Sequence, residues 1–405
     1  MSTPRTGLIL TGGGARAAYQ VGVLRAVSRI RREVQGPQGN PFPVISGTSA
    51  GAIIASVLAC HADHFDQAVE ALHDTWGQFT AEQVYRADAF GVVRTGARWL
   101  TMFTLGWAIA RWRRARPRSL LDNSPLEALL RRTVEFERLP YVMSQGHLDG
   151  LAITASSYSS GDHVTFYDAV REIPPWTRSH RIACRSHLSV EHLLASSAIP
   201  FVFPSVRLPL LGQSEWFGDG SMRQSAPISP AVHLGAERIL VVGAGRMHEP
   251  TTRRAVSDSY PSLAQIAGHA LSNIFLDSLA VDVERLQRIN KTLSLLPPEA
   301  LQHTALRPIE VLVIAPSQRL DDVASKHINA LPPAVRTMLR GVGVSGEGKG
   351  QGPSGSALAS YLLFESAYTQ ELMNLGELDT QARRDEVIRF FGWQPPLDPT
   401  LAMSA

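Results

Sequence analysis

The sequence predicts an α/β protein built around a mostly parallel sheet, and three observations carry this prediction. Two strand-turn-helix units follow one another at the start of the chain, over residues 6–34 and 43–60, as in parallel sheets. The chain has 405 residues, 44% hydrophobic and 19% charged, which suits a large core and is too little charge for a disordered protein. Short apolar runs suited to further strands recur at 151–156, 163–167, 214–217, 238–242 and 309–314.

The first unit places a glycine-rich turn between a strand and a helix. Residues 6–11 are a short apolar strand, and residues 17–34 carry apolar side chains at every third position of one helical face. Between them stands Gly12-Gly13-Gly14-Ala15-Arg16-Ala17. Such a turn presents unpaired backbone N–H groups at the positive end of a helix dipole, so it predicts an anion-binding loop.

Two kinds of anion fit this loop. A dinucleotide pyrophosphate matches the relaxed pattern Gly12-x-Gly14-x-x-Ala17, but the next strand ends in Gly47-Thr48-Ser49, where an acidic residue for the ribose is expected. A P-loop is excluded because no Gly-Lys-Ser or Gly-Lys-Thr follows. The other anion is the oxyanion of a tetrahedral acyl intermediate. A glycine turn with no ligand is the plain alternative.

The second unit contains Gly47-Thr48-Ser49-Ala50-Gly51, a G-x-S-x-G sequence between an apolar strand and a helix that reaches about Cys60. At a tight strand-to-helix corner the backbone leaves no room for flanking side chains, so glycines stand there and the serine is exposed. The pentapeptide alone is weak evidence. Beside the glycine loop, it predicts that Ser49 is a nucleophile on an elbow formed by Gly47 and Gly51.

A serine nucleophile needs a base, and Asp219 is the candidate. It follows the apolar strand at 214–217 and precedes Gly220. An ordinary Asp-Gly turn is the alternative. His233 and His248 come later in the chain, so a Ser-Asp-His triad is also open, although only one strand precedes the elbow strand.

Together these residues resemble the patatin-like phospholipases, whose pattern combines a glycine-rich oxyanion loop, a G-x-S-x-G elbow, an A-S-x-A-x-P segment and a D-G-G or D-G-A tripeptide. The resemblance covers about residues 6–242, and four motifs in order are far more specific than one. Two positions depart from the pattern, because Ala17 stands in place of glycine and Ser221 in place of glycine or alanine. The four motifs are Gly12-Gly13-Gly14-Ala15-Arg16-Ala17, Gly47-Thr48-Ser49-Ala50-Gly51, Ala195-Ser196-Ser197-Ala198-Ile199-Pro200 and Asp219-Gly220-Ser221.

The resemblance implies a three-layer α/β/α sandwich and a Ser49/Asp219 dyad that works without a histidine. Ser49 would attack an ester carbonyl while Asp219 takes its proton, and water would then hydrolyse the acyl-enzyme. The implied substrates are fatty acyl esters of phospholipids or related lipids, with neither cofactor nor metal. The residues implied for the oxyanion hole are Gly12, Gly13, Gly14, Ala15 and Arg16.

The two departures also motivate a rival hypothesis, a catalytically silent membrane-binding or scaffolding protein that keeps the fold. Ala17 is harmful only if its position requires a positive φ or a close backbone approach. Ser221 adds one hydroxyl group. The Arg16 side chain has three possible roles: holding the loop, attracting a lipid phosphate, or standing solvated at the helix start.

The chain is expected to divide into a phospholipase domain at 6–320 and a C-terminal helical extension at 321–393 that packs on it. Amphipathic helices are expected at 358–375 and 379–391, and residues 341–356 form a glycine-rich loop. A helix is also expected at Ser124, with Ser124 and Glu127 forming a capping box.

Residues 98–119 suggest contact with a membrane surface. Trp99, Phe103 and Trp107 lie four residues apart beside an arginine cluster, which suits a helix lying on anionic lipid. The apolar run is too short to span a bilayer. A lid over the site and a buried helix with a basic end are the alternatives.

The cysteine count, the N-terminal residues and the net charge indicate the cellular setting. Cys60 and Cys184 alone give no disulfide framework, and the first residues lack the apolar stretch of a signal peptide. A cytoplasmic protein, peripheral on the membrane, is therefore expected. The net charge of +3 requires no nucleic-acid partner.

Overall fold

The structure is a computed structural model that describes residues 4–34, 36–86, 119–247, 263–304, 306–341, 344 and 356–393. Three features expected from the sequence lie outside these residues. They are the membrane-facing helix apart from its last residue, most of the glycine-rich loop, and His248. Within them, no helix is both long enough and apolar enough to cross a bilayer.

A ten-stranded sheet forms the centre of the described fold, and its strand order is β10-β9-β1-β2-β3-β4-β6-β5, with β8 also pairing with β3. The first five strands in this order are parallel, so Leu8 of β1 aligns with Ile45 of β2 and Leu240 of β9. The strands are β1 (Thr6–Leu10), β2 (Val44–Thr48), β3 (Gly150–Ser157), β4 (His163–Ala169), β5 (Thr177–Arg178), β6 (Arg181–Arg185), β7 (Val206–Leu210), β8 (Gln213–Asp219), β9 (Arg238–Val242) and β10 (Glu310–Ile314).

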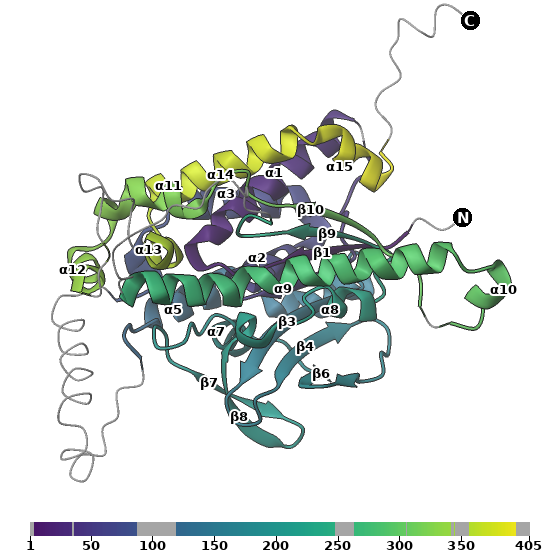
Figure 1. Cartoon of the computed structure of the whole chain (residues 1–405), viewed down its shortest axis with the longest axis horizontal. Coiled ribbons are helices and arrows are strands. Elements are labelled where there is room, and N and C mark those ends of the chain that lie inside the picture. Colours follow the sequence, from purple (N-terminus) through teal and green to yellow (C-terminus); the bar gives the residue numbers. More distant parts are fainter. Residues whose placement is uncertain are drawn as a thin grey trace, which may run out of the picture.

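Helices cover both faces of this sheet. Figure 1 shows α9 crossing one face, whereas α1, α3 and α14 gather on the other. The described helices are α1 (Ala18–Glu33), α2 (Ala50–Cys60), α3 (Phe65–Gly77), α5 (Ser124–Thr133), α6 (Leu139–Ser144), α7 (Val190–Ser196), α8 (Ser229–His233), α9 (Leu263–Ser294), α10 (Pro298–Leu301), α11 (Leu320–His327), α12 (Pro333–Gly341), α13 (Ser356–Leu362), α14 (Ser366–Gln381) and α15 (Arg384–Phe391), with 3-10 turns at η1 (Gly14–Ala17), η2 (Ala62–His64), η3 (Ala81–Gln83), η4 (Phe136–Arg138), η5 (Gly220–Arg223) and η6 (Ile328–Ala330).

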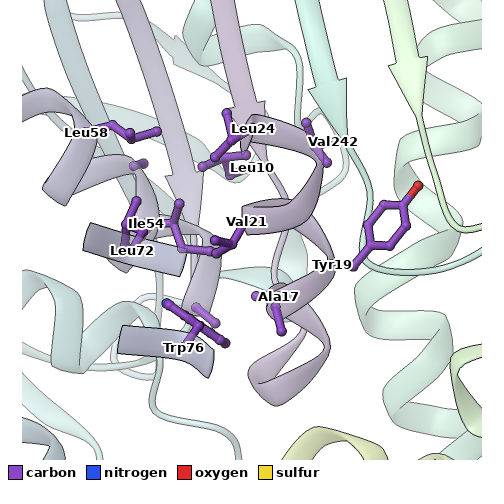
Figure 2. Packing of buried hydrophobic residues seen from close by; sticks show 14 of the residues in the cluster. Leu10, Ala17, Tyr19, Val21, Leu24, Ile54, Leu58, Leu72, Trp76 and Val242 are labelled. Carbon is purple, nitrogen blue, oxygen red and sulfur yellow. The ribbon is translucent and has the colours of Figure 1, made fainter. Parts of the chain in front are cut away.

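Alternation along the strands separates two hydrophobic clusters. Leu8 and Leu10 of β1 are buried in the cluster that includes α1, α2, α3 and α14. Ile9, between them, is buried in the other cluster with Leu279 and Val283 of α9. Figure 2 shows side chains from β1, α1, α2 and α3 meeting in the first cluster. The expected three-layer α/β/α fold with a mostly parallel sheet is therefore confirmed.

Two helix boundaries differ from the expectations. Helix α5 starts at Ser124, but Asn123 occupies the cap position without a side-chain cap, and Glu127 binds Arg131 instead of closing a capping box. The second expected boundary, at 375–379, falls inside α14. The chain instead breaks before Ser366, where Phe364 is buried against the ring of Phe79, with centroids 6.1 Å apart.

The C-terminal helices pack closely on the N-terminal unit. A Cβ at Gly22 of α1 would lie 1.9 Å from the carbonyl oxygen of Met373 in α14, and one at Gly376 would lie 2.3 Å from that of Tyr19. The Tyr19 hydroxyl donates to Asp379 at 3.0 Å. The two helices thus touch through their backbones, because glycine stands at each point of closest approach.

Candidate active site

Ser49 sits on a sharp corner between β2 and α2. Its φ is 55° and its ψ is −130°, a conformation that a residue with a side chain rarely adopts. A Cβ at Gly47 would lie 2.5 Å from Ala52 Cα, and one at Gly51 would lie 2.4 Å from the carbonyl oxygen of Leu10. Both flanking positions therefore require glycine for the steric reason that the motif suggested.

The segment from Ala195 to Pro200 holds the Ser49 corner and Asp219 together. The Ser49 N–H donates to Ser196 Oγ at 2.8 Å, and the Asp219 N–H donates to the carbonyl oxygen of Ala198 at 3.0 Å. Ser196 is fully buried at the end of α7. The sequence pattern contains this serine, but only the fold gives it a role.

Asp219 reaches the same edge of the sheet as Ser49 through β3. Thr48, the last residue of β2, aligns with Thr154 on β3, and the next residue of β3 aligns with Asp219 on β8. The Asp219 side chain is completely buried, and its Oδ1 accepts the N–H of Ser221 at 2.8 Å. Its Oδ2 has no hydrogen-bond partner among the described residues.

Burial raises the pKa of Asp219 to about 6, and the nearby hydroxyls of Ser49 and Ser221 act in the opposite direction. The Ser49 hydroxyl is thus near enough to influence the carboxylate, although no hydrogen bond of normal geometry joins it to Oδ2. Catalytic hydrogen bonds are often long before substrate binds. The arrangement therefore suits proton transfer from Ser49 to Asp219.

A buried polar network lies beneath the corner. Thr48 Oγ1 and Thr154 Oγ1 are 2.7 Å apart, and Gln224 Nε2 donates to Thr48 Oγ1 at 2.8 Å. These bonds tie the end of β2 to β3 and to the segment after Asp219. Sequence reasoning missed Thr154 and Gln224, because nothing in their local context distinguishes them from ordinary polar residues.

The glycine loop lies next to the corner, and its backbone supplies free donors. Among the described residues, no backbone hydrogen bond uses the N–H of Gly13 or Gly14, whereas the N–H of Arg16 donates to the carbonyl oxygen of Gly13 at 3.1 Å. Gly14 has a φ of 55°, and both Gly14 and Ser49 line the same groove. The backbone N–H of Arg16 is thus already engaged inside the turn.

Ala17 and Arg16 resolve two questions that the sequence leaves open. Ala17 has a φ of −64°, so its position needs no glycine conformation. The Arg16 side chain is buried and forms an ion pair with Asp321, so it is neither solvated nor directed at a lipid phosphate. Ala17 consequently gives no ground for expecting an inactive loop.

An apolar groove of about 340 Å³ leads away from Ser49 along α2. Gly14, Ser49 and Ser197 lie at the reactive end, and His61 and His64 lie beyond the other end of α2. The walls between them come mainly from one face each of α2, α3 and α5: Ile53, Val57, Ala68, Ala71, Leu72, Trp76, Leu126, Leu129 and Leu130. Such a shape suits one hydrocarbon chain with its end at Ser49.

Of the two histidines considered for a triad, His233 lies within the part of the chain that the structure describes. His233 stacks on Trp176, with ring centroids 4.2 Å apart, and Trp176 belongs to the cluster on the α9 face. The described residues contain no group of three or more side chains suited to a metal ion. Titratable side chains do lie near Asp219: His163 is buried beside Gly220, and the pKa of Tyr158 is raised by burial and by the charge of Asp219.

Comparisons with a curated protein and with solved structures give partial matches. A stretch of 57 residues is 42% identical to Lysophospholipase NTE1 of Chaetomium globosum, and it covers 14% of this chain and 3% of that protein. VipD from Legionella pneumophila aligns over 92% of this chain and 67% of its own, at 13% identity and a TM-score of 0.30. Human GIVD cytosolic phospholipase A2, solved with a methyl gamma-linolenyl fluorophosphonate inhibitor, aligns over 96% and 59%, at 13% identity and a TM-score of 0.38.

The family comparison covers the site itself. The family model described as patatin-like phospholipase matches residues 8–232, which is more than half of the chain. This match includes the glycine loop, the Ser49 corner, the segment from Ala195 to Pro200 and Asp219. The chain therefore belongs to the patatin-like phospholipase family.

Proposed function

We propose that this protein is a serine acyl hydrolase that cleaves fatty acyl esters of phospholipids or related lipids. The observation that carries the proposal is the buried Oδ2 of Asp219 beside Ser49, which has no hydrogen-bond partner among the described residues. One segment anchors both residues at the end of an apolar groove. A buried carboxylate with a raised pKa is suited to receive a proton near neutral pH.

The reaction begins when Ser49 Oγ attacks the ester carbonyl and its proton passes to Asp219. The tetrahedral intermediate collapses, the Asp219 proton goes to the leaving alkoxide, and the lysolipid or other alcohol departs from an acyl-Ser49 ester. Asp219 then takes a proton from water, which attacks this ester. The second tetrahedral intermediate collapses, the proton passes from Asp219 to Ser49 Oγ, and the fatty acid leaves with Ser49 and the Asp219 carboxylate both regenerated. Each step uses groups that lie at one edge of the sheet.

The oxyanion is stabilised by backbone N–H groups at Gly13 and Gly14, with the start of α2 adding its dipole. Gly12 and Ala15 flank these two donors. Arg16 supports the loop through its side chain, since its N–H is engaged by Gly13. Loss of one such donor typically costs on the order of 3 kcal/mol of transition-state stabilisation.

The groove binds the acyl chain, and the lipid head group stays outside it. We expect this groove of about 340 Å³ to hold a single acyl chain. A groove for one chain favours an activity of the phospholipase A or lysophospholipase type for this protein. The short match to Lysophospholipase NTE1 supports the same activity. We place the reaction at a membrane surface, on the cytoplasmic side, with the protein bound peripherally, and we retain 6–320 as the phospholipase domain.

The test compares wild type, Ser49→Ala and Asp219→Asn in hydrolysis of a soluble short-chain ester and of phospholipid vesicles. We expect turnover by wild type and a loss of at least 10³-fold in each variant, on the order of what removal of a nucleophile or its base costs. Equal turnover in all three would eliminate the dyad. A well-folded wild type that cleaves no acyl ester would instead favour the silent scaffold.

A further inference from the structure

The glycine loop is covered by the C-terminal helices. The Arg16 guanidinium, only 2% exposed as a residue, forms an ion pair with Asp321 in the first turn of α11. Its Nε donates to Ser360 Oγ at 2.7 Å, and its Nη2, the nitrogen that pairs with Asp321, also donates to the carbonyl oxygen of Ala357 at 3.3 Å. The guanidinium also lies 4.0 Å from the ring centroid of Tyr361. All four of these partners of the buried cation come from residues beyond 320.

The loop backbone touches the same helices directly. A Cβ at Gly14 would lie 2.4 Å from the carbonyl oxygen of Tyr361, so α13 fixes how far the loop can move on that side. The end of α13 is held in turn, because the Tyr85 hydroxyl donates to the carbonyl oxygen of Leu362 at 2.8 Å. The loop is thus confined between the Ser49 groove and α13.

The Arg16–Asp321 pair is joined to the glycine loop through the Arg16 backbone. Arg16 follows Gly13, Gly14 and Ala15 directly, and its own N–H closes the turn onto Gly13 at 3.1 Å. The Arg16 side chain is therefore attached directly to the turn that contains Gly13 and Gly14. Without its carboxylate, the Arg16 guanidinium would be an uncompensated buried charge. It would move toward solvent, and the turn would be displaced outward with it.

We infer that Asp321 is a positioning residue, which holds Arg16 and through it the N–H groups of Gly13 and Gly14 in the geometry that stabilises the oxyanion. The inference rests on the proposed function. It assigns a part in the reaction to a segment that lies outside the 8–232 match to the family.

The C-terminal helices do not depend on this pair for their place in the fold. Helix α14 contacts α1 backbone to backbone at Gly22 and Gly376. Glu371 of α14 binds Lys326 of α11 at 2.8 Å and His327 at 2.6 Å. Removal of the Asp321 charge therefore leaves the packing of α11 and α14 in place, and its effect is expected at the loop.

The experiment compares Asp321→Asn with Glu371→Gln, which removes a carboxylate that pairs with Lys326 and His327 of α11, whereas Asp321 pairs with Arg16. On a soluble short-chain ester, Asp321→Asn should lower kcat on the order of 10²-fold, with KM within about twofold. Glu371→Gln should keep the wild-type kcat. Hydrogen exchange should become faster in the peptide containing Gly12 to Ala17 for Asp321→Asn alone. Asp321→Glu should recover part of both losses.

Two readouts separate this inference from the proposed function. If Ser49→Ala hydrolyses the ester as fast as wild type, the proposed dyad is wrong. Hydrogen exchange in the glycine loop then remains as the test of whether Asp321 holds the loop in place. If exchange in the loop is unchanged in folded Asp321→Asn, or if exchange rises while kcat stays at the wild-type value, the positioning role is refuted. Should Asp321→Asn not fold, Ser360→Ala, which removes one acceptor of Arg16, carries the same test with a smaller expected loss of kcat.

Discussion

Asp219 gives the proposed dyad a defined pH dependence. Burial raises its pKa to about 6, and a base works only when it is deprotonated. We therefore expect kcat/KM on a soluble ester to rise with pH, to pass half of its maximum near pH 6 and to level off above. Because the Ser221 hydroxyl lowers the pKa of Asp219, Ser221→Ala, which restores the family tripeptide, should move the half-maximal point to higher pH.

The control for this pH shift is Ser225→Ala, which removes an exposed hydroxyl six positions after Asp219. Its profile should coincide with that of wild type. A half-maximal point that moves to lower pH in Ser221→Ala would contradict the role given to this hydroxyl.

The same carboxylate has a cost for stability. In the unfolded chain Asp219 regains its ordinary pKa of 3.8, whereas the folded value is about 6. The folded state is therefore penalised only above pH 3.8, and the full penalty of about 3 kcal/mol is present above pH 6. Asp219→Asn should thus raise the free energy of unfolding at pH 8 by up to this amount and leave it nearly unchanged at pH 4. Urea titrations at both pH values measure the difference, and an Asn variant less stable than wild type at pH 8 would argue against it.

Among the elements, the contact between α1 and α14 depends on two glycines. Gly22→Ala would place a Cβ 1.9 Å from the Met373 carbonyl oxygen, so the helices would have to separate. We expect the free energy of unfolding to fall by about 1–3 kcal/mol, although alanine favours a helix by about 1 kcal/mol. Gly77→Ala in α3 is the control, because its Cβ would meet Met373 Cε at an ordinary 3.5 Å. Equal denaturant midpoints for the two variants would show that the backbone contact is not tight.

The elements also show where sequence reasoning succeeds. The strands β1 and β2 could be predicted because short apolar runs that end in glycine-rich corners are local signals. The reason for Gly47 and Gly51 is steric and equally local. The break before Ser366 has no proline or glycine to announce it. It exists because Phe364 is buried against Phe79 from a distant part of the chain, and no local pattern records that contact.

Across the whole molecule, the groove predicts selectivity for chain length. Ala71 of α3 lines the groove, so Ala71→Phe should shorten the space available to an acyl chain. Each methylene excluded from the groove should lower kcat/KM about fourfold, which corresponds to about 0.8 kcal/mol per buried methylene. Hydrolysis of a short-chain ester should not change. A series of esters of increasing chain length measures this effect.

The control for the groove is Asp74→Phe, which adds the same ring to α3 at a residue that does not line the groove. Its preference for chain length should match that of wild type. If both variants lose long-chain activity equally, the groove does not hold the chain.

The candidate site could be predicted in part for the same reason as the fold. Ser49 and Asp219 stand in motifs, so their residue types and spacing are enough to point to the chemistry. Arg16 stands in a motif as well, but its partner Asp321 is 305 positions away and lies in a helix with no distinguishing pattern. Long-range polar contacts such as this one depend on how the helices pack on the sheet. That packing is determined by residues throughout the chain and not by a local sequence pattern.

The separation of Arg16 and Asp321 along the chain also determines the order in which the parts of the site become available during synthesis. During synthesis the ribosome delivers Ser49 first, Asp219 next and Asp321 only when most of the polypeptide has emerged, since domains fold as their residues become available. A nascent chain that lacks α11 and α13 would therefore carry the nucleophile and the base while the glycine loop is still unsupported. The proposed positioning role of Asp321 therefore predicts that the hydrolase gains its activity only late in translation.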